Sequence, residues 1–268
     1  MHITSSEAES LLEREVKVLD HGFVRLVDYM GSDHRIVAAA RVSTGTGSKG
    51  PEQDKKLIEY LIKCRHTSPL EQVVLVFHMR LPIFVARQLV RHRTARINEL
   101  SGRYSVLKDE FYIPDPDQVR LQSSVNKQGR SESQVLAPLD ELVRFEAEQG
   151  AAAGAYHERL QSGMARELAR INLPLSVYTE WYWQMDLHNL FHFLALRLDA
   201  HAQWEIRQYA QVLLQMARAV APVATEAWER YILHSVTLSQ EEVQELKQMV
   251  AEEQRQGDVW DKLATVSP

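Results

Sequence analysis

Cysteine is almost absent from this chain of 268 residues, which contains only Cys64. A single cysteine excludes an internal disulfide framework and a CxxC redox or zinc site. Such a chain suits a reducing compartment, so we expect a cytoplasmic location. Glycine and proline are also scarce, at 11 and 9 residues, which leaves few obligatory turns and favours long helices.

Long hydrophobic runs are missing as well. No segment approaches the ~18 uninterrupted apolar residues of a membrane-spanning helix, and the opening MHITSSEAES lacks the basic and apolar stretches of a targeting peptide. We therefore expect neither a membrane span nor a targeting segment. The formal net charge of −5 argues against general nucleic-acid binding unless positive charge is concentrated locally.

The order of apolar and turn-forming residues predicts early strands followed by a mostly helical chain. Strands are expected within 15–30 and over 73–81, and the polar, proline-containing span 114–135 is expected to be a loop. Predicted helices cover 34–42, 52–64, 83–92, 136–172, 175–198, 200–221 and 225–233. The charged tail suggests a boundary between a domain at 1–238 and an extension at 239–268, read as a peripheral helix or a frayed end.

Positive charge is concentrated between residues 80 and 105. This window holds six arginines, no lysine and one acidic residue, Glu99, so its net charge is +5 in a chain of −5. Arginine favours planar, bidentate recognition of phosphate or carboxylate. With Pro82 at the first position of a helix, Arg87 and Arg91 should lie one turn apart on one side of it. The block therefore predicts a site for a phosphorylated ligand.

Two other interpretations of the arginine block remain open. A run of charge is commonly a solvated face, although this one follows an apolar helix directly and continues into the more apolar, glycine-containing INELSGRYS. An RNA-binding module would also use arginines, but the block lacks the repeated aromatic platforms expected of one.

The segment RHRTARINELSGRYS, residues 91–105, resembles the signature R-H-R-x-x-S-x-N-E-x-S-x-R-Y of the flavin-dependent thymidylate synthases. Eight positions match, namely Arg91, His92, Arg93, Asn98, Glu99, Ser101, Arg103 and Tyr104. Arg96 stands where the family has Ser. The resemblance spans most of 15–232 and implies an α/β (α+β) fold, a single domain with a central antiparallel sheet and long helices.

A second segment, RHTSPLEQ at 65–72, resembles the family's R-H-x-[ST]-P-F-E-H. His66, Ser68 and Glu71 match, and the resemblance places them beside the flavin and its phosphates. Leu70 and Gln72 replace the usual Phe and His, so the contacts of that second His do not carry over.

His188 and His192 are four residues apart and share a helix face, which raises a metal site as an alternative. Asn189 occupies the place of the catalytic Glu in H-E-x-x-H, so a metal-dependent hydrolase is disfavoured. Two hydrogen-bonded core histidines are a further interpretation. The resemblance instead places Asp186, Leu187, His188 and His192 at the flavin.

Two arginines in the C-terminal half also match the family. Arg197 corresponds to an arginine that contacts the pyrimidine and favours its ionisation. A guanidinium stays protonated, so its catalytic role would be to stabilise a developing uracil anion electrostatically. Arg170 corresponds to an arginine that reaches the nucleotide from another subunit, although a surface ion pair is the simpler interpretation of that residue taken alone.

Together these matches imply an enzyme that makes dTMP from dUMP, with 5,10-methylenetetrahydrofolate as one-carbon donor, reduced FAD as hydride donor and NADPH as reductant. The implied assembly is a homotetramer with sites shared between subunits, without metal, nucleic acid or membrane. The residues implied for FAD are His66, Ser68, Arg91, His92, Arg93, Glu99, Asp186, Leu187, His188 and His192. Those implied for dUMP are Gln88, Leu89, Val90, Arg91, Glu99, Leu100, Ser101, Gly102, Arg103, Arg170 and Arg197.

Cys64 is the one thiol that could attack uracil C6, as the thiolate of the cysteine-dependent thymidylate synthases does. Arg65 and His66 are neighbours that could lower its pKa. The flavin family has no thiolate in this segment, so we interpret Cys64 as structural and expect the cofactor to supply the difficult chemistry.

Overall fold

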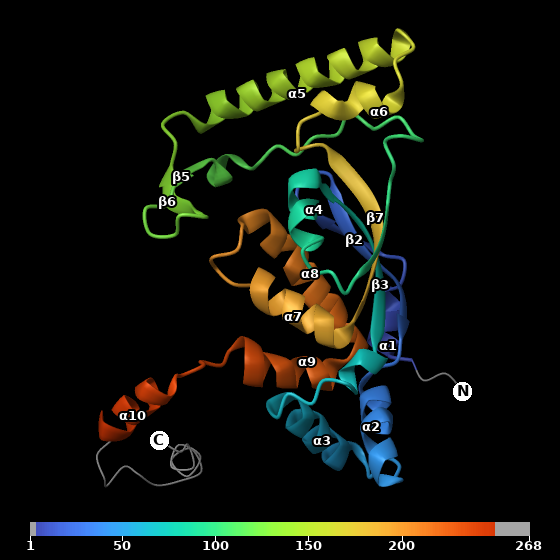
Figure 1. Ribbon diagram of the computed structural model, residues 1–268, viewed down its shortest axis with the longest axis vertical. Coiled ribbons are helices and arrows are strands. Elements are labelled where there is room, and N and C mark those ends of the chain that lie inside the picture. The colour runs from blue at the N-terminus through green and yellow to red at the C-terminus, as the bar shows by residue number, and fades with distance from the viewer. Residues whose placement is uncertain (1–3, 250–268) are drawn as a thin grey trace.

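A five-stranded antiparallel sheet forms the centre of the protein in a computed structural model that describes residues 4–249 (Figure 1). The strand order is β1-β2-β3-β7-β4. The strands are β1 (Glu15–Val18), β2 (Gly22–Met30), β3 (Val74–Pro82), β7 (Tyr178–Asp186) and β4 (Arg96–Glu99). This confirms the predicted strands near 15–30 and 73–81 and the central antiparallel sheet.

The two longest pairings run along β3, which lies between β2 and β7. Phe77 faces Trp183 across the β3–β7 ladder, and both side chains are fully buried. Alternate residues of β3 point into the same core, whereas His78 and Tyr182 lie on the opposite, partly exposed face. Burial of each large apolar side chain stabilises the sheet by about 1.5–3 kcal/mol.

Strand β7 corrects the predicted helix at 175–198. Only α7 (Leu187–Arg197) is helical there, and Tyr178–Asp186 pairs with both β3 and β4. The run YTEWYWQMD is rich in aromatic residues, which fit a pleated surface well. Asp186 ends the strand and begins the helix, because its side chain accepts a hydrogen bond from the backbone N–H of Asn189.

Helices cover the buried face of the sheet. α7 and α8 (Trp204–Val220) lie against it, and α1 (Ser6–Leu11) packs on α8 (Figure 1). At one end, α9 (Pro222–Trp228) packs on α3 (Pro51–Lys63) and α8, beside α2 (Asp33–Arg41). A π-helical turn (Glu229–Leu233) and α10 (Gln240–Met249) complete the described chain. The predicted helices at 34–42, 52–64, 200–221 and 225–233 are thus confirmed, with shifted ends.

The opposite end of the molecule departs more from the sequence predictions. The expected loop at 114–135 contains a hairpin of β5 (Arg120–Gln122) and β6 (Arg130–Gln134). The expected helix at 136–172 is broken into α5 (Pro138–Gln161), α6 (Arg166–Ala169) and a 3-10 turn (Arg170–Asn172). Gly163 at the break has a φ of +84°, a left-handed conformation that glycine adopts readily. Figure 1 shows α5 and α6 side by side beyond the end of the sheet.

The helix after β3 is shorter than predicted. α4 (Ile83–Leu89) begins after Pro82, which is its N-cap rather than its first residue, and it ends before Arg91. Arg87 and Arg91 therefore do not share one helix, which corrects the predicted arrangement. Further 3-10 turns are Val42–Thr44, Leu70–Gln72 and Pro116–Gln118. Between residues 4 and 249, no helix combines the length and apolarity needed to cross a bilayer.

Candidate functional site

His92 is the point where the arginine-rich segment meets helix α7. Its buried ring lies 4.9 Å from the ring of Phe193 and 5.9 Å from that of His192, both on α7. The Nε of Arg197 donates to Nε2 of His92 over 3.3 Å. We call Arg91, His92, His192 and Arg197 the imidazole–arginine cluster. It joins two segments that are about a hundred residues apart in the sequence.

Local structure brings the cluster together. The chain turns after α4, where the backbone N–H of His92 donates to the carbonyl of the buried Leu89 over 2.9 Å. Arg197 lies one helical turn beyond Phe193 on α7, so the two share a face. The structure thus brings the signature segment into contact with the C-terminal part of α7.

The cluster is electrostatically suited to an anionic ligand. Burial, with the positive charges of Arg197 and His192, lowers the pKa of His92 to about 4, so its ring is neutral at pH 7. Burial and the nearby Arg91 also lower the pKa of Arg197, which nevertheless stays protonated. Two guanidinium groups close to a neutral imidazole leave an excess of positive charge for a ligand to offset.

A cavity of about 210 Å³ lies on the other side of His192, between α3, α7 and the end of α9. We call it the α7 cavity. Its lining residues are Leu61, Ile62, Arg65, Thr67, Leu70, His188, Phe191, His192, Ala195, Trp228 and Ile232. Apolar and aromatic walls with a guanidinium and two imidazoles fit part of a flavin dinucleotide, whose rings are planar and whose linker is anionic. The volume is below the ~300–1,000 Å³ of typical ligand pockets, so this chain would hold only part of FAD.

The other residues predicted for FAD are not among those that line this cavity. His66 is exposed, with its ring 5.7 Å from that of Tyr60, and Ser68 lines a neighbouring hollow with Arg35. Arg93 is exposed. The carboxylate of Asp186 already accepts from the backbone and side-chain N–H groups of Asn189, and the Leu187 side chain is fully buried in the core.

A second group of predicted residues surrounds the turn after β4, at 100–103. A Cβ on Gly102 would lie 3.0 Å from Cδ of Arg170, so the absence of a side chain lets Arg170 pack over this turn. Arg103 forms an ion pair of 3.2 Å with Glu167, and Ser101 accepts backbone hydrogen bonds from Tyr104 and Ser105. We call 100–103 with Arg170 the signature turn.

The remaining residues predicted for dUMP are Gln88, Leu89 and Val90, at the end of α4, and Glu99, at the end of β4. Gln88 donates from Nε2 to Oε1 of Gln203 over 2.5 Å, and Leu89 is buried while Val90 is exposed. Glu99 accepts from the Thr179 hydroxyl over 2.6 Å, which ties β4 to β7. The predicted site thus consists of two clusters, one at α7 and one at the signature turn.

The metal alternative finds no support in the described residues. His188 and His192 lie on α7 as expected, but residues 4–249 contain no group of three or more His, Cys, Asp or Glu side chains that could hold a metal ion. Cys64 is exposed just after α3 and is not among the residues that line the α7 cavity.

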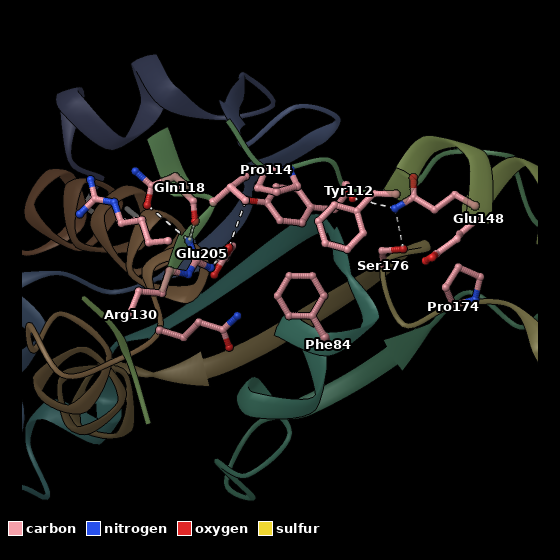
Figure 2. Close-up of a pocket in the computed structure, with 14 residues that line it drawn as sticks. Phe84, Tyr112, Pro114, Gln118, Arg130, Glu148, Pro174, Ser176 and Glu205 are labelled. Carbon is pink, nitrogen blue, oxygen red and sulfur yellow. Dashed lines mark hydrogen bonds and ion pairs between the residues drawn. The ribbon is translucent and has the colours of Figure 1, made fainter. Parts of the chain in front are cut away.

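The sequence analysis missed a larger cavity, of about 500 Å³, beneath the β5–β6 hairpin (Figure 2). Glu205, only 1% exposed, lies at its base, where it accepts from the Tyr112 hydroxyl over 3.1 Å and forms an ion pair with Arg130 of β6. An isolated acidic residue in the apolar stretch HAQWEIRQYA was the available signal, because a buried carboxylate needs partners.

Comparisons with known proteins show the family to which this chain is similar. Residues 25–223 match the family model described as "Thymidylate synthase complementing protein". The flavin-dependent thymidylate synthase of Treponema denticola is 54% identical over 242 residues, which cover 90% of this chain and 91% of the relative. The Treponema pallidum relative of the same name is 54% identical over 254 residues, covering 94% and 83%.

The fold is also similar to that of a solved structure. The UMP/dUMP methylase PolB from Streptomyces cacaoi, bound with 5-Br UMP, superimposes with a TM-score of 0.72 at 33% identity, covering 82% of this chain and 99% of that one. The same methylase bound with 5-Br dUMP gives the same TM-score.

Proposed function

The chain belongs to the flavin-dependent thymidylate synthase family, and from this membership we propose that the imidazole–arginine cluster and the signature turn together form its active site. The protein is a flavin-dependent thymidylate synthase. It methylates dUMP to dTMP with 5,10-methylenetetrahydrofolate as one-carbon donor, reduced FAD as hydride donor and NADPH as reductant. The observation that carries the site assignment is the Arg197–His92 contact, which joins the signature to helix α7.

The proposed binding residues for each ligand come from both clusters and from the segments next to them. FAD is held by His66, Ser68, Arg91, His92, Arg93, Glu99, Asp186, Leu187, His188 and His192. The nucleotide dUMP is held by Gln88, Leu89, Val90, Arg91, Glu99, Leu100, Ser101, Gly102, Arg103, Arg170 and Arg197. Oxygen acceptors of a nucleotide phosphate suit the backbone and arginine donors of the signature turn.

Arg197 stabilises charge at the pyrimidine. When bound, FAD supplies the hydride that converts the transferred methylene to a methyl group. Ionisation of the pyrimidine makes uracil C5 nucleophilic towards the methylene and places negative charge on the ring, and a fixed guanidinium lowers the energy of that charged state. His92 accepts from Nε of Arg197 and so orients the guanidinium while leaving its other N–H groups for the substrate. Because His92 is neutral at pH 7, it adds no competing positive charge.

The reaction proceeds without a cysteine nucleophile. Cys64 is the only thiol in the chain and lies exposed at the end of α3. We expect Cys64→Ala to retain dTMP formation. Loss of turnover in a folded, flavin-loaded Cys64→Ala protein would show that the thiol acts in the reaction.

We further propose that the active enzyme is a homotetramer whose sites combine subunits. Leu168, Ile171 and Leu175, which are near Arg170 in the sequence, are 55–70% exposed, and so are Leu139 and Val143 at the start of α5. Exposed apolar side chains of this kind favour association. Arg170 packs on the turn at Gly102, which it would help to complete for a neighbouring subunit.

Two coarser assignments follow. We place the catalytic domain at 1–238 and treat 239–268 as an extension, of which α10 is the described part and 250–268 lie outside the described residues. A cytoplasmic location suits the single, exposed Cys64.

A spectrum followed by one assay tests the proposed function. We expect the purified protein to show flavin absorbance, to lose it on anaerobic addition of NADPH with dUMP, and to release dTMP when methylenetetrahydrofolate is added. The assay should be repeated with UMP in place of dUMP. A colourless protein that binds no FAD, or a flavoprotein that makes no dTMP, would contradict the proposal.

A further inference from the structure

Two neighbouring residues of β7 hold the chain at the point where β4 leads into the signature turn. The Thr179 hydroxyl donates to Oε1 of Glu99 over 2.6 Å. The backbone carbonyl of Glu180 accepts from the N–H of Leu100 over 2.8 Å. Glu99 is the last residue of β4, and the signature turn begins at Leu100. The start of this turn is therefore fixed to an interior strand of the sheet.

The Thr179 hydroxyl depends on Glu99 as its acceptor. The Thr179 side chain is 4% exposed, so its hydroxyl needs a hydrogen-bond partner within the protein. Within residues 4–249, Glu99 accepts the only hydrogen bond that this hydroxyl donates. The distance of 2.6 Å is typical of a hydroxyl that donates to a carboxylate. The contact is thus required by the buried partner and available to the exposed one.

The geometry of the sheet directs this hydroxyl at Glu99. Glu99 pairs with Trp181 across the β4–β7 ladder, and Thr179 lies two residues from Trp181 on the same face of β7. Thr179 is therefore a diagonal neighbour of Glu99, within reach of a long side chain. Because a β-branched side chain has few rotamers in a strand, Thr179 offers a rigid donor to a flexible glutamate.

The second carboxylate oxygen of Glu99 stays available to a ligand. Glu99 is exposed, and within residues 4–249 its side chain makes no ion pair and no hydrogen bond other than the one to Thr179. A carboxylate oxygen accepts hydrogen bonds. A uracil nucleotide offers matching donors, namely the N3–H of its base and the hydroxyl of its sugar. Because Glu99 borders the turn proposed for dUMP, its free oxygen is placed to accept from one of these donors.

We propose that Thr179 is a positioning residue for dUMP, whose hydroxyl holds Oε1 of Glu99 so that Oε2 accepts a hydrogen bond from the nucleotide. This inference rests on the proposed function, because it concerns the nucleotide site of that reaction. A glutamate that is free to rotate would lose side-chain freedom each time dUMP binds. Here the protein has already restricted that freedom on folding, so binding the nucleotide costs less.

Two substitutions at Thr179 separate the hydroxyl from the shape of the side chain. Thr179→Val removes the hydroxyl and keeps the branched shape, whereas Thr179→Ser keeps the hydroxyl and removes a methyl group. Dissociation constants for dUMP are measured by equilibrium dialysis on the FAD-loaded protein, so the result does not depend on turnover. We expect Thr179→Val to weaken dUMP binding about tenfold and Thr179→Ser to bind within about twofold of the wild type.

Steady-state assays and a matched control separate positioning from a loss of fold. The KM for dUMP should rise in Thr179→Val more than kcat falls, because the lost contact binds substrate and transition state alike. Thr225 is 0% exposed, and its hydroxyl donates to the carbonyl of Ala221 over 2.8 Å at α9. Thr225→Val removes the same group from a buried threonine outside both clusters, so it should bind dUMP as the wild type does. FAD content and urea unfolding show that each variant is folded.

A second background tests whether Thr179 acts through Glu99. Glu99→Ala removes the carboxylate, so adding Thr179→Val to it should change dUMP affinity by less than about twofold. If Thr179→Val does not fold, Thr179→Ala and Thr179→Ser give the same comparison, because they differ only by the hydroxyl. We then expect Thr179→Ala to bind dUMP more weakly than Thr179→Ser.

Specific results would overturn the proposal. Equal dUMP affinity in wild type and Thr179→Val, an equal loss in Thr179→Val and Thr179→Ser, or a loss that persists unchanged in the Glu99→Ala background would each remove this role from Thr179. Weaker FAD binding with normal dUMP binding would assign the Glu99 contact to the flavin instead. If the wild type makes dTMP but Thr179→Val binds dUMP normally, the inference fails while the proposed function stands. A wild type that makes no dTMP would contradict the proposed function, and the dUMP affinities would still test Thr179.

Discussion

The Arg197 side chain is held in place by one hydrogen bond, and the rest of its charged guanidinium is available to a ligand. Its Nε is committed to His92, so the side chain cannot swing freely, while the remaining guanidinium N–H groups stay available. Partial burial strengthens any interaction with a developing anion, because little water screens it. The catalytic role that we propose for this arginine thus depends on a histidine that is neutral at pH 7.

For Arg197→Ala we expect FAD to remain bound and dTMP formation to fall by about 10²–10³, the usual effect of removing one donor that stabilises a transition state. Arg197→Lys should recover only part of the loss, since a lysine keeps the charge without the planar fork. Flavin absorbance and single-turnover dTMP formation measure the two effects separately. A turnover rate in Arg197→Ala near that of the wild type would remove this arginine from the mechanism.

His92 predicts a dependence of stability on pH. Its pKa is about 4 in the folded protein and 6.5 as a free side chain, so between these values the unfolded chain binds the extra proton and the folded chain does not. The free energy of unfolding should therefore fall as the pH drops from 6.5 towards 4, by up to about 3 kcal/mol from this residue.

Urea unfolding of the flavin-free protein at pH 7.5 and pH 4.5 tests the His92 effect. We expect His92→Gln to lose less stability than wild type between the two pH values. His201→Gln, at an exposed histidine, should behave as the wild type does. An identical pH dependence in wild type and His92→Gln would show that His92 is protonated normally in the folded protein.

At the level of elements, the β1–β2 turn is held against α8 by a glycine. A Cβ on Gly22 would overlap the buried Tyr209 hydroxyl and lie 2.5 Å from the carbonyl oxygen of Val18. That hydroxyl donates to the carbonyl of Arg80 on β3 over 2.8 Å. One small residue thus lets a turn, a helix and a central strand meet.

Gly22→Ala should lower the free energy of unfolding by about 1–3 kcal/mol, because the added methyl group forces the turn away from Tyr209. Gly150 in α5 is the matched control, since a Cβ there meets nothing within 4 Å. Gly150→Ala should raise the free energy of unfolding by about 0.5–1 kcal/mol through helix propensity. Urea unfolding measures both, and equal stability in the two variants would contradict the close approach at Gly22.

At the level of the whole molecule, the proposed dUMP residues divide into two clusters that different subunits would bring together. Arg197 belongs to one cluster and Arg170 to the other. If each site takes one cluster from each of two subunits, variants that damage different clusters should complement each other in a mixed assembly.

Arg170→Ala and Arg197→Ala should each make little dTMP alone. Refolded or co-expressed together, they should recover up to about a quarter of wild-type activity, because random mixing in a closed oligomer joins two undamaged clusters in that share of sites. Mass measurement by light scattering establishes that the assembly is mixed. A mixed tetramer without recovered activity would mean that both arginines act within one subunit.

The residues proposed for the site could be picked out from the sequence because they lie in short segments whose residues are close together along the chain. Arg91 and His92 are adjacent in the signature segment and could be recognised there directly. The four-residue spacing of His188 and His192 predicts that both lie on one face of a helix, and both are in α7. The early strands and most helices also follow from short-range patterns of apolar residues.

The secondary structure around the site could be predicted less well from the sequence. The run at 178–186 was predicted as helix, and it became strand β7 because β3 and β4 offer hydrogen-bonding partners on both sides. Aromatic and apolar residues such as Trp181 and Trp183 can be buried in either element, so pairing with distant strands decided between them.

The sequence by itself determined which side chains carry charge, which segments we propose for phosphate and flavin, and that Cys64 is the only thiol that could act as a nucleophile. Only the tertiary structure decided that Arg197 meets His92, that Arg170 packs on Gly102, and that the buried Glu205 forms an ion pair with Arg130. The physical reason is the range of the interactions. Composition and spacing set local chemistry, whereas burial, pKa and unpaired charge depend on residues that folding brings together from far along the chain.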